Sequence, residues 1–215
     1  ESVEGQVRET VRDSLAVFER LGATLVDVSL PNSAAGIPCY YVIAPAEASS
    51  NLSRFDGVRF GHRSQHADEL LDLYENSRAE GFGEEVKRRI LIGTYALSAG
   101  YYDAYYKRAL QVRRLIRDEF NAVFEQCDVL LGPTTNGPAF ELGSKNDPLS
   151  MYLCDRYTVN ANIAGICGIS LPSGLTDVDG RMLPLGIQRQ APALGEATLL
   201  RAARMYESSA GHNAY

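Results

Sequence analysis

Serine and histidine side chains are the first candidates for nucleophilic chemistry in this sequence of 215 residues. Ser173 lies in a Leu-Pro-Ser-Gly segment, and the histidines are His62, His66 and His212. A nucleophile needs a base that activates it, and these residues form no Ser/His/Asp pattern. The sequence also has neither a Gly-x-Ser-x-Gly elbow nor a Gly-rich phosphate-binding loop. We therefore interpret Ser173 as a turn residue, with a nucleophilic role as the alternative.

The cysteines are spaced in a way that does not favour a metal site. They are Cys39, Cys127, Cys154 and Cys167, and no two of them form a Cys-x-x-Cys pair. The histidines do not cluster with them, so zinc is a poor interpretation. We expect free, buried thiols in a cytoplasmic protein and no bound metal.

Arg89 has an informative position in a predicted helix. At about 100° per residue, one apolar stripe of this helix contains Val86, Ile90, Gly93 and Leu97. Arg89 lies on the flank of this stripe, whereas Arg88 points to the opposite face. The pattern predicts that Arg89 can reach the edge of a pocket. The alternative is that Arg89 pairs with a nearby carboxylate, because ion pairs are common and binding sites are few.

A group of tyrosines follows in the same helical region. Its members are Tyr95, Tyr101, Tyr102, Tyr105 and Tyr106. Exposed aromatic rings can stack on nucleic-acid bases, but the formal net charge of −6 repels phosphates. We therefore predict that these rings pack between helices, and that any RNA is held by a partner.

Composition and periodicity indicate an α/β protein. Apolar residues make up 45% of the chain. The sequence has no run of about 18 apolar residues, which a membrane span would need. The acidic start has no signal peptide pattern and no initiator Met, so we expect the natural start to lie upstream.

Helices are predicted at residues 2–21, 38–55, 67–78, 84–126 with a hinge near 98–100, 147–163 and 196–206. Strands are predicted at residues 23–30, 128–133, 168–174 and 184–188, with a hairpin turn at 179–180. Four short strands would leave apolar sheet edges, which suggests that other strands are supplied from elsewhere.

Four segments resemble the A subunits of tRNA-dependent amidotransferases, which belong to the amidase-signature family. The segments are EASSNLSRFDG within residues 44–61, EGFGEEVKRRI at the start of 80–106, DVLLGPT at 128–134 and DPLSMY at 147–152. The resemblance covers nearly the whole chain and is collinear, so it is highly specific. It implies an amidase-signature fold, in which residues 1–215 form the C-terminal portion of one domain, with a mixed central sheet flanked by helices.

The resemblance also implies where the chemistry lies. Family members release ammonia from glutamine with a serine nucleophile, a second serine in a cis peptide and a lysine base. These residues belong to a Gly/Ser-rich segment that is expected upstream of this chain. No catalytic residue is therefore assigned here, and the isolated chain is expected to be inactive.

Three substrate-binding residues follow from the resemblance, namely Tyr40, Arg89 and Asp155. In the family, a tyrosine, an arginine and an aspartate from this half bind glutamine. A guanidinium suits the α-carboxylate of glutamine, and a carboxylate suits its α-ammonium group. The Tyr40 hydroxyl can donate or accept a hydrogen bond at the pocket wall. Without the resemblance, Asp155 would be interpreted as a solvated residue inside a helix.

The function implied by the resemblance is the glutamine-hydrolysing subunit of an enzyme that converts Glu-tRNA(Gln) to Gln-tRNA(Gln). Expected partners are a B subunit, which uses ATP and magnesium, and a small C subunit, in a cytoplasmic heterotrimer. This chain would need no cofactor, and it would meet tRNA only through the complex. Two alternatives stay open: another amidase-signature hydrolase acting on other amides, or an inactive truncated fragment.

Overall fold

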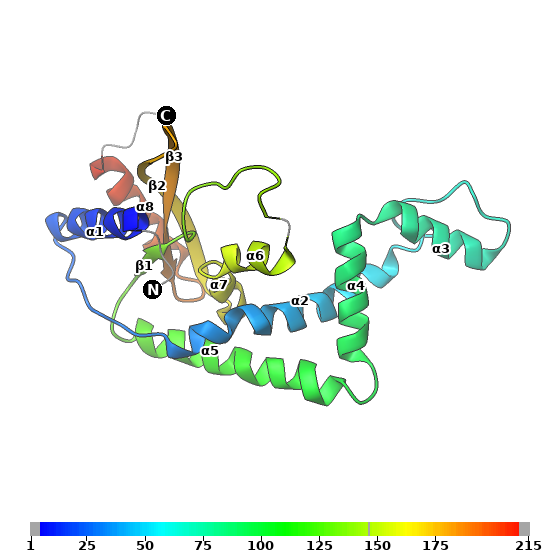
Figure 1. Cartoon of the computed structure of the whole chain (residues 1–215). Coiled ribbons are helices and arrows are strands. Elements are labelled where there is room, and N and C mark those ends of the chain that lie inside the picture. Colours follow the sequence, from blue (N-terminus) through cyan, green and yellow to red (C-terminus); the bar gives the residue numbers. More distant parts are fainter. Residues whose placement is uncertain (1–4, 146, 211–215) are drawn as a thin grey trace. The chain divides into compact units, whose positions relative to one another are not determined.

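The computed structural model describes residues 5–145 and 147–210 as two compact units. The first unit combines residues up to 37 with residues from 113 onward, and the second contains residues 38–112. The first unit holds a sheet with helices, whereas the described part of the second is helical (Figure 1). This alternation of helices and strands confirms the predicted α/β class.

A three-stranded antiparallel sheet is the centre of the first unit. Its strands are β1 (Leu130–Pro133), β2 (Cys167–Val178) and β3 (Arg181–Ala191), in the order β1-β3-β2. The predicted hairpin turn at Asp179 and Gly180 joins β2 to β3, and both residues have positive φ angles of 51° and 80°. Such angles characterise the tight turn that matches strand twist. The Asp177 carboxylate accepts a hydrogen bond of 2.7 Å from the Gly180 amide and stabilises this turn.

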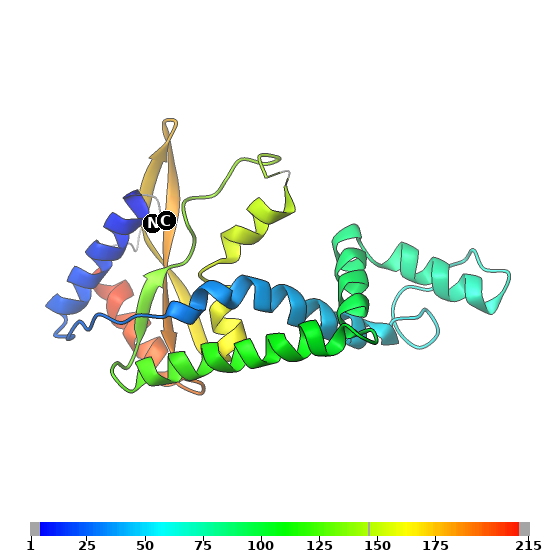
Figure 2. The same ribbon diagram turned by 60° about the horizontal axis from the view of Figure 1, so that its bottom comes forward.

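Two helices from opposite ends of the chain cover one face of the sheet. They are α1 (Gly5–Arg20) and α8 (Glu196–Ser209), which Figure 2 shows on the same side of the strands. The core between them contains Val17, Ile187 and Tyr206, against which Leu131 and Leu171 pack. Leu171 pairs with Ile187 across the strands, so both side chains lie on this covered face.

One predicted strand, residues 23–30, is wrong. This segment is extended, but it belongs to no strand of the described sheet. Leu25 and Val26 are 42% and 47% exposed, so the alternating apolar pattern is not matched by a buried face. An apolar alternation becomes a strand only where a neighbouring backbone supplies hydrogen-bond partners, and the described residues supply none here.

The predicted helix at residues 147–163 is broken into shorter pieces. The Asp147 carboxylate caps its start by accepting a hydrogen bond of 2.8 Å from the Ser150 amide, as predicted. The helix α6 (Pro148–Tyr152) then tightens into a 3₁₀ turn at Leu153–Asp155, and α7 (Val159–Ala164) follows. Gly165, with a φ of 72°, ends α7 before β2.

The second unit is built around the crossing of several helices. They are most of α2 (Gly36–Asn51), α3 (Leu70–Gly81), α4 (Glu84–Leu97), a π-helical turn (Tyr102–Lys107) and the start of α5 (Arg108–Phe124). Short 3₁₀ turns, Pro31–Ala35 and Leu52–Arg54, flank α2. Gly100, with a φ of 88°, lies at the predicted hinge of the long helical region. The Cys39 thiol donates to the Ala109 carbonyl at 3.2 Å and joins α2 to α5.

The tyrosines of this unit pack mainly on one another. The ring centroids of Tyr95 and Tyr101 lie 4.2 Å apart, and Tyr105 contacts both rings. Tyr95 is 53% exposed and Tyr105 is 48% exposed. The rings therefore connect α4 to the π-helical turn, but they are half-exposed rather than buried between helices. No helix of the described chain has the length and apolar character that a bilayer crossing requires.

Candidate functional site

The crossing of α2 and α4 positions the first two predicted site residues. A Cβ atom placed on Gly93 of α4 would lie 1.9 Å from the Pro45 carbonyl oxygen of α2, which is far inside van der Waals contact. Only glycine allows the two helix backbones to approach this closely. The contact fixes which turns of the two helices face each other.

Arg89 lies one turn before Gly93, and Tyr41 lies one turn before Pro45. The Arg89 guanidinium carbon is 5.8 Å from the centroid of the Tyr41 ring, a cation–π distance. Tyr40 is in edge-to-face contact with Tyr41, with ring centroids 5.1 Å apart. The predicted residues Tyr40 and Arg89 are thus brought together within the second unit.

Arg89 also has the acidic neighbour that the ion-pair alternative requires. Its Nε donates to the Glu85 Oε1 atom at 2.9 Å, one helical turn away. The Arg89 side chain is 33% exposed and that of Arg88 is 52% exposed, so Arg89 is the more enclosed, as its periodicity predicted. The ion pair occupies one edge of the guanidinium, which has five N–H donors, and is compatible with a bound ligand.

The electrostatic surroundings of Arg89 favour its charged form. Burial acts to lower the pKa of Arg89, but the Glu85 hydrogen bond and the interaction with the Tyr40 hydroxyl outweigh burial and raise it. The hydrogen bond from Arg89 likewise lowers the pKa of Glu85. At neutral pH this part of the second unit therefore presents a fixed, partly enclosed cation beside a phenol.

Asp155, the third predicted residue, belongs to the first unit. It is the last residue of the 3₁₀ turn Leu153–Asp155, not part of a continuous helix, and it is exposed. Its backbone carbonyl accepts hydrogen bonds from the amide and hydroxyl of Thr158. The break after α6 leaves this residue at the end of a 3₁₀ turn that is followed by turn residues 156–158.

Of the serine and histidine candidates, Ser173 and His62 have side chains held by structural hydrogen bonds. The Ser173 hydroxyl, 6% exposed, donates to the Leu185 carbonyl at 3.3 Å. The interpretation of Ser173 as a turn residue is wrong, because β2 continues past it through a bulge between Pro172 and Gly174. In the second unit, His62 pairs with Glu80 at 2.5 Å. His212 lies outside the described residues.

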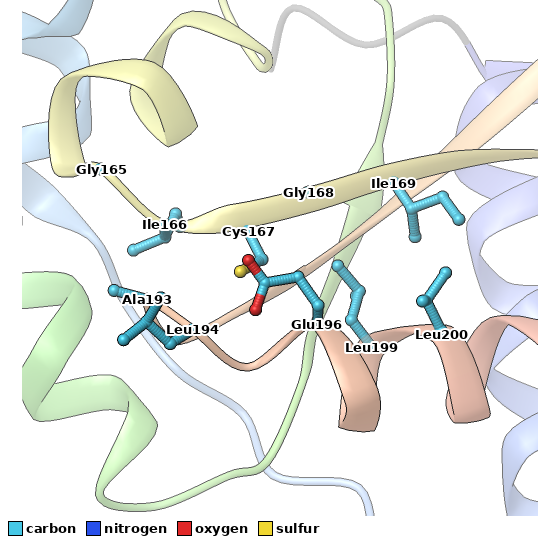
Figure 3. Close-up of a pocket in the computed structure, with 10 residues that line it drawn as sticks. All are labelled: Gly165, Ile166, Cys167, Gly168, Ile169, Ala193, Leu194, Glu196, Leu199 and Leu200. Carbon is cyan, nitrogen blue, oxygen red and sulfur yellow. The ribbon is translucent and has the colours of Figure 1, made fainter.

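A pocket in the first unit lies between β2 and α8. It has a volume of about 470 Å³ and an apolar lining that includes Ile166, Ile169, Leu199 and Leu200. Figure 3 shows Leu199 rising from α8 toward the strand that carries Cys167 and Ile169. Its described lining residues include no lysine or arginine, so an amino-acid carboxylate would find no counter-charge there. This pocket does not suit a zwitterionic ligand.

Two residues around Arg89 were missed by reasoning from the sequence. Glu85 could have been found, because a glutamate four residues before an arginine is a standard helical ion pair. Tyr41 could not, because its contact with Arg89 depends on the crossing angle that Gly93 and Pro45 set.

The sheet and its helices match a known class of protein. The Amidase family profile matches residues 1–200, and the chain belongs to this family.

Individual proteins that the chain resembles give a closer comparison than the family profile. The chain is 57% identical over 203 residues to the A subunit of the glutamyl-tRNA(Gln) amidotransferase of Pseudomonas putida, covering 94% of this chain and 41% of the relative. The crystal structure of the corresponding A subunit from Thermotoga maritima superposes with a TM-score of 0.71 at 38% identity, covering 99% of this chain and 41% of that one. The Kluyveromyces lactis allophanate hydrolase shares the fold, with a TM-score of 0.72 at 22% identity, covering 98% of this chain and 30% of that one. The chain thus spans about two fifths of the length of the amidotransferase subunits that it resembles.

Proposed function

We propose that this chain carries the glutamine-recognition side of the A subunit of a tRNA-dependent amidotransferase. In this role, Arg89 binds the α-carboxylate of glutamine, Tyr40 hydrogen-bonds at the pocket wall, and Asp155 receives the α-ammonium group. The observation that carries the proposal is the convergence of Tyr40, Tyr41 and Arg89 at the α2–α4 crossing. Amidotransferase relatives at 54–57% identity support the assignment of substrate.

The bond-breaking chemistry is proposed to come from residues outside this sequence. Family resemblance implies a serine nucleophile, a cis-peptide serine and a lysine base. The Ser173 hydroxyl is engaged with a backbone carbonyl, which leaves it poorly suited to attack an amide. The complete subunit would release ammonia from glutamine, which a partner would use to convert Glu-tRNA(Gln) to Gln-tRNA(Gln).

The proposed partners are a B subunit that uses ATP and magnesium, and a small C subunit, in a cytoplasmic complex. Since the chain has a formal net charge of −6, we propose that tRNA is held by a partner rather than by this chain. The chain itself would need no metal or nucleotide.

The experiment that tests the proposal is glutamine hydrolysis by the complete subunit with Arg89→Ala. Loss of a charge-assisted hydrogen-bond pair should raise the KM for glutamine roughly 10- to 100-fold. Arg114→Ala is a matched control, because Arg114 also pairs with an acidic residue one turn away, Asp118, and is 82% exposed. An unchanged KM in Arg89→Ala would refute the recognition role.

A second comparison distinguishes glutamine from other amide substrates. The proposed site pairs opposite charges with an amino-acid zwitterion, so turnover of glutamine should exceed that of an uncharged amide such as propionamide. Arg89→Ala should reduce this preference. If the wild-type subunit hydrolyses the uncharged amide equally well, another amidase activity is favoured.

A further inference from the structure

The Glu85 carboxylate bridges two neighbouring arginines at the start of α4. Its Oε1 atom accepts from Arg89 Nε at 2.9 Å, and its Oε2 atom accepts from Arg88 Nη1. Glu84, the adjacent acidic residue, points elsewhere and pairs with Lys87 at 2.6 Å. Glu85 therefore has a specific relation to Arg89 that its neighbour lacks.

This contact determines which edge of the Arg89 guanidinium remains for a ligand. A guanidinium can bind a carboxylate along its Nε–Nη edge or through its two Nη groups. Glu85 occupies the Nε edge, while the Tyr41 ring lies 5.8 Å from the guanidinium carbon. The two Nη groups remain for a ligand, and the Tyr40 hydroxyl interacts with the same guanidinium.

Charge in this cluster also favours an anionic ligand. A simple Arg89–Glu85 pair would be neutral and would not attract a carboxylate. Arg88 shares the same glutamate, so the three side chains carry a net charge of +1. The second arginine thus restores the positive charge that Glu85 would otherwise cancel.

We propose that Glu85 is a positioning residue, which holds the Arg89 guanidinium so that its two Nη groups receive the α-carboxylate of the substrate. Glu85 does not touch the substrate in this arrangement. It acts by reducing the number of orientations that Arg89 must give up on binding, a form of preorganisation. The inference rests on the proposed glutamine-recognition function and adds a residue that sets its geometry.

The test compares Glu85→Ala, Glu85→Gln and Glu84→Gln in the complete subunit. Two substrates are used: L-glutamine, and L-glutaminamide, in which a carboxamide replaces the α-carboxylate. Glu85→Ala should raise the KM for glutamine roughly 10-fold and leave kcat within about twofold, because only carboxylate binding is weakened. The KM for glutaminamide should stay unchanged.

Two variants separate positioning from charge and from folding. Glu85→Gln removes the charge but keeps an oxygen that can accept a hydrogen bond from the Arg89 Nε–H. Its KM for glutamine should therefore lie close to that of wild type. Glu84→Gln makes a similar change in charge without contacting Arg89 and should behave as wild type. Thermal melting of each variant checks that the fold is retained.

The outcomes distinguish this inference from the function on which it rests. If Arg89→Ala raises the KM for glutamine but Glu85→Ala has the same KM as Glu84→Gln, positioning by Glu85 is refuted and recognition by Arg89 is supported. If Glu85→Ala affects both substrates equally, its role is structural and the inference also fails. If neither Arg89→Ala nor Glu85→Ala changes the KM for glutamine, both the proposed function and the inference are refuted.

Discussion

The Arg189 guanidinium carbon lies 3.9 Å from the centroid of the Tyr206 ring, which is closer than in any other described cation–π pair. Arg189 is fully buried, and within the described chain its Nε, Nη1 and Nη2 atoms have no hydrogen-bond acceptor. The ring of Phe18, 5.1 Å away, contributes a second aromatic contact. Among the described residues, the rings of Tyr206 and Phe18 are the contacts of this buried cation, and the interaction with Tyr206 favours its charged form.

We expect Arg189→Met to leave stability unchanged or to increase it by up to about 4 kcal/mol. Burial of a charge is costly, and an apolar side chain of similar length removes that cost while filling the space. Chemical denaturation would measure the free energy of unfolding, with Arg181→Met, an exposed arginine on the same strand, as control. A loss above about 2 kcal/mol would show that the cation–π contacts outweigh the burial penalty.

Alkaline pH gives an independent test of how the buried Arg189 charge affects stability. Burial lowers the pKa of Arg189 to about 10, and the interaction with Tyr206 opposes only part of this shift. The unfolded chain would keep the proton to higher pH than the folded chain, so the free energy of unfolding contributed by Arg189 should rise as the pH increases above about 10. The difference between wild type and Arg189→Met should change over this range, whereas a constant difference would contradict the shift.

Gly93→Ala should disrupt the α2–α4 crossing. The new methyl group would meet the Pro45 carbonyl at 1.9 Å, and neither backbone can yield without moving its helix. We expect a loss of about 1–3 kcal/mol in stability, together with a raised KM for glutamine, because Arg89 and Tyr41 shift with the helices. Gly132→Ala is the control, since a Cβ atom there would meet nothing within 4 Å. Equal melting temperatures for the two variants would mean that the close approach is not needed.

Acid should weaken the loop that follows α2. The hydrogen bond from His62, and next that from Ser64, lower the pKa of Glu80 below its usual value of 4.5. Stability from this carboxylate is therefore fully present above about pH 4.5 and is lost as the pH falls through the lower folded-state pKa. We expect Glu80→Gln to flatten the acid-unfolding curve followed by circular dichroism, and His62→Asn to do so in part. An exposed glutamate variant, Glu47→Gln, should leave the curve as in wild type.

The half-exposed tyrosines should be visible in an alkaline titration. The hydrogen bond with Tyr101 is the largest of the effects that raise the pKa of Tyr95 to about 12. Ultraviolet absorbance of phenolate should therefore show a group that ionises with a pKa of about 12, and Tyr101→Phe should bring this pKa back toward 10. Tyr102→Phe is the control, because Tyr102 stacks with Tyr106 instead. A late-ionising group that persists in Tyr101→Phe would contradict the assignment.

Local patterns were sufficient to predict much of this fold. The turn at Asp179 and Gly180, the cap at Asp147 and the hinge near Gly100 depend on residues a few positions apart, and all three are present. The prediction of one continuous helix at residues 147–163 is wrong, because a 3₁₀ turn at Leu153–Asp155 interrupts the helix.

Features that depend on distant partners could not be predicted. Residues 23–30 have the alternation of a strand, but a strand also needs a neighbour, which a local pattern does not show. The burial of Arg189, which lies between two glutamines in the sequence, depends on aromatic contacts that come from α1 and α8. At the candidate site, the helical face of Arg89 was predictable, whereas its contact with Tyr41 required the helix crossing.

The hydrogen bond between the Ser14 and Tyr206 hydroxyls, at 2.8 Å, closes a loop of 192 residues. During synthesis, α1 must therefore wait for α8 before the sheet can gain its covered face, and closing so long a loop is slow. Residues 38–112 are contiguous and can reach their helical packing while the ribosome is still translating β2 and β3. The order in which the chain emerges thus favours early folding of the arginine-bearing helices and late closure of the sheet unit.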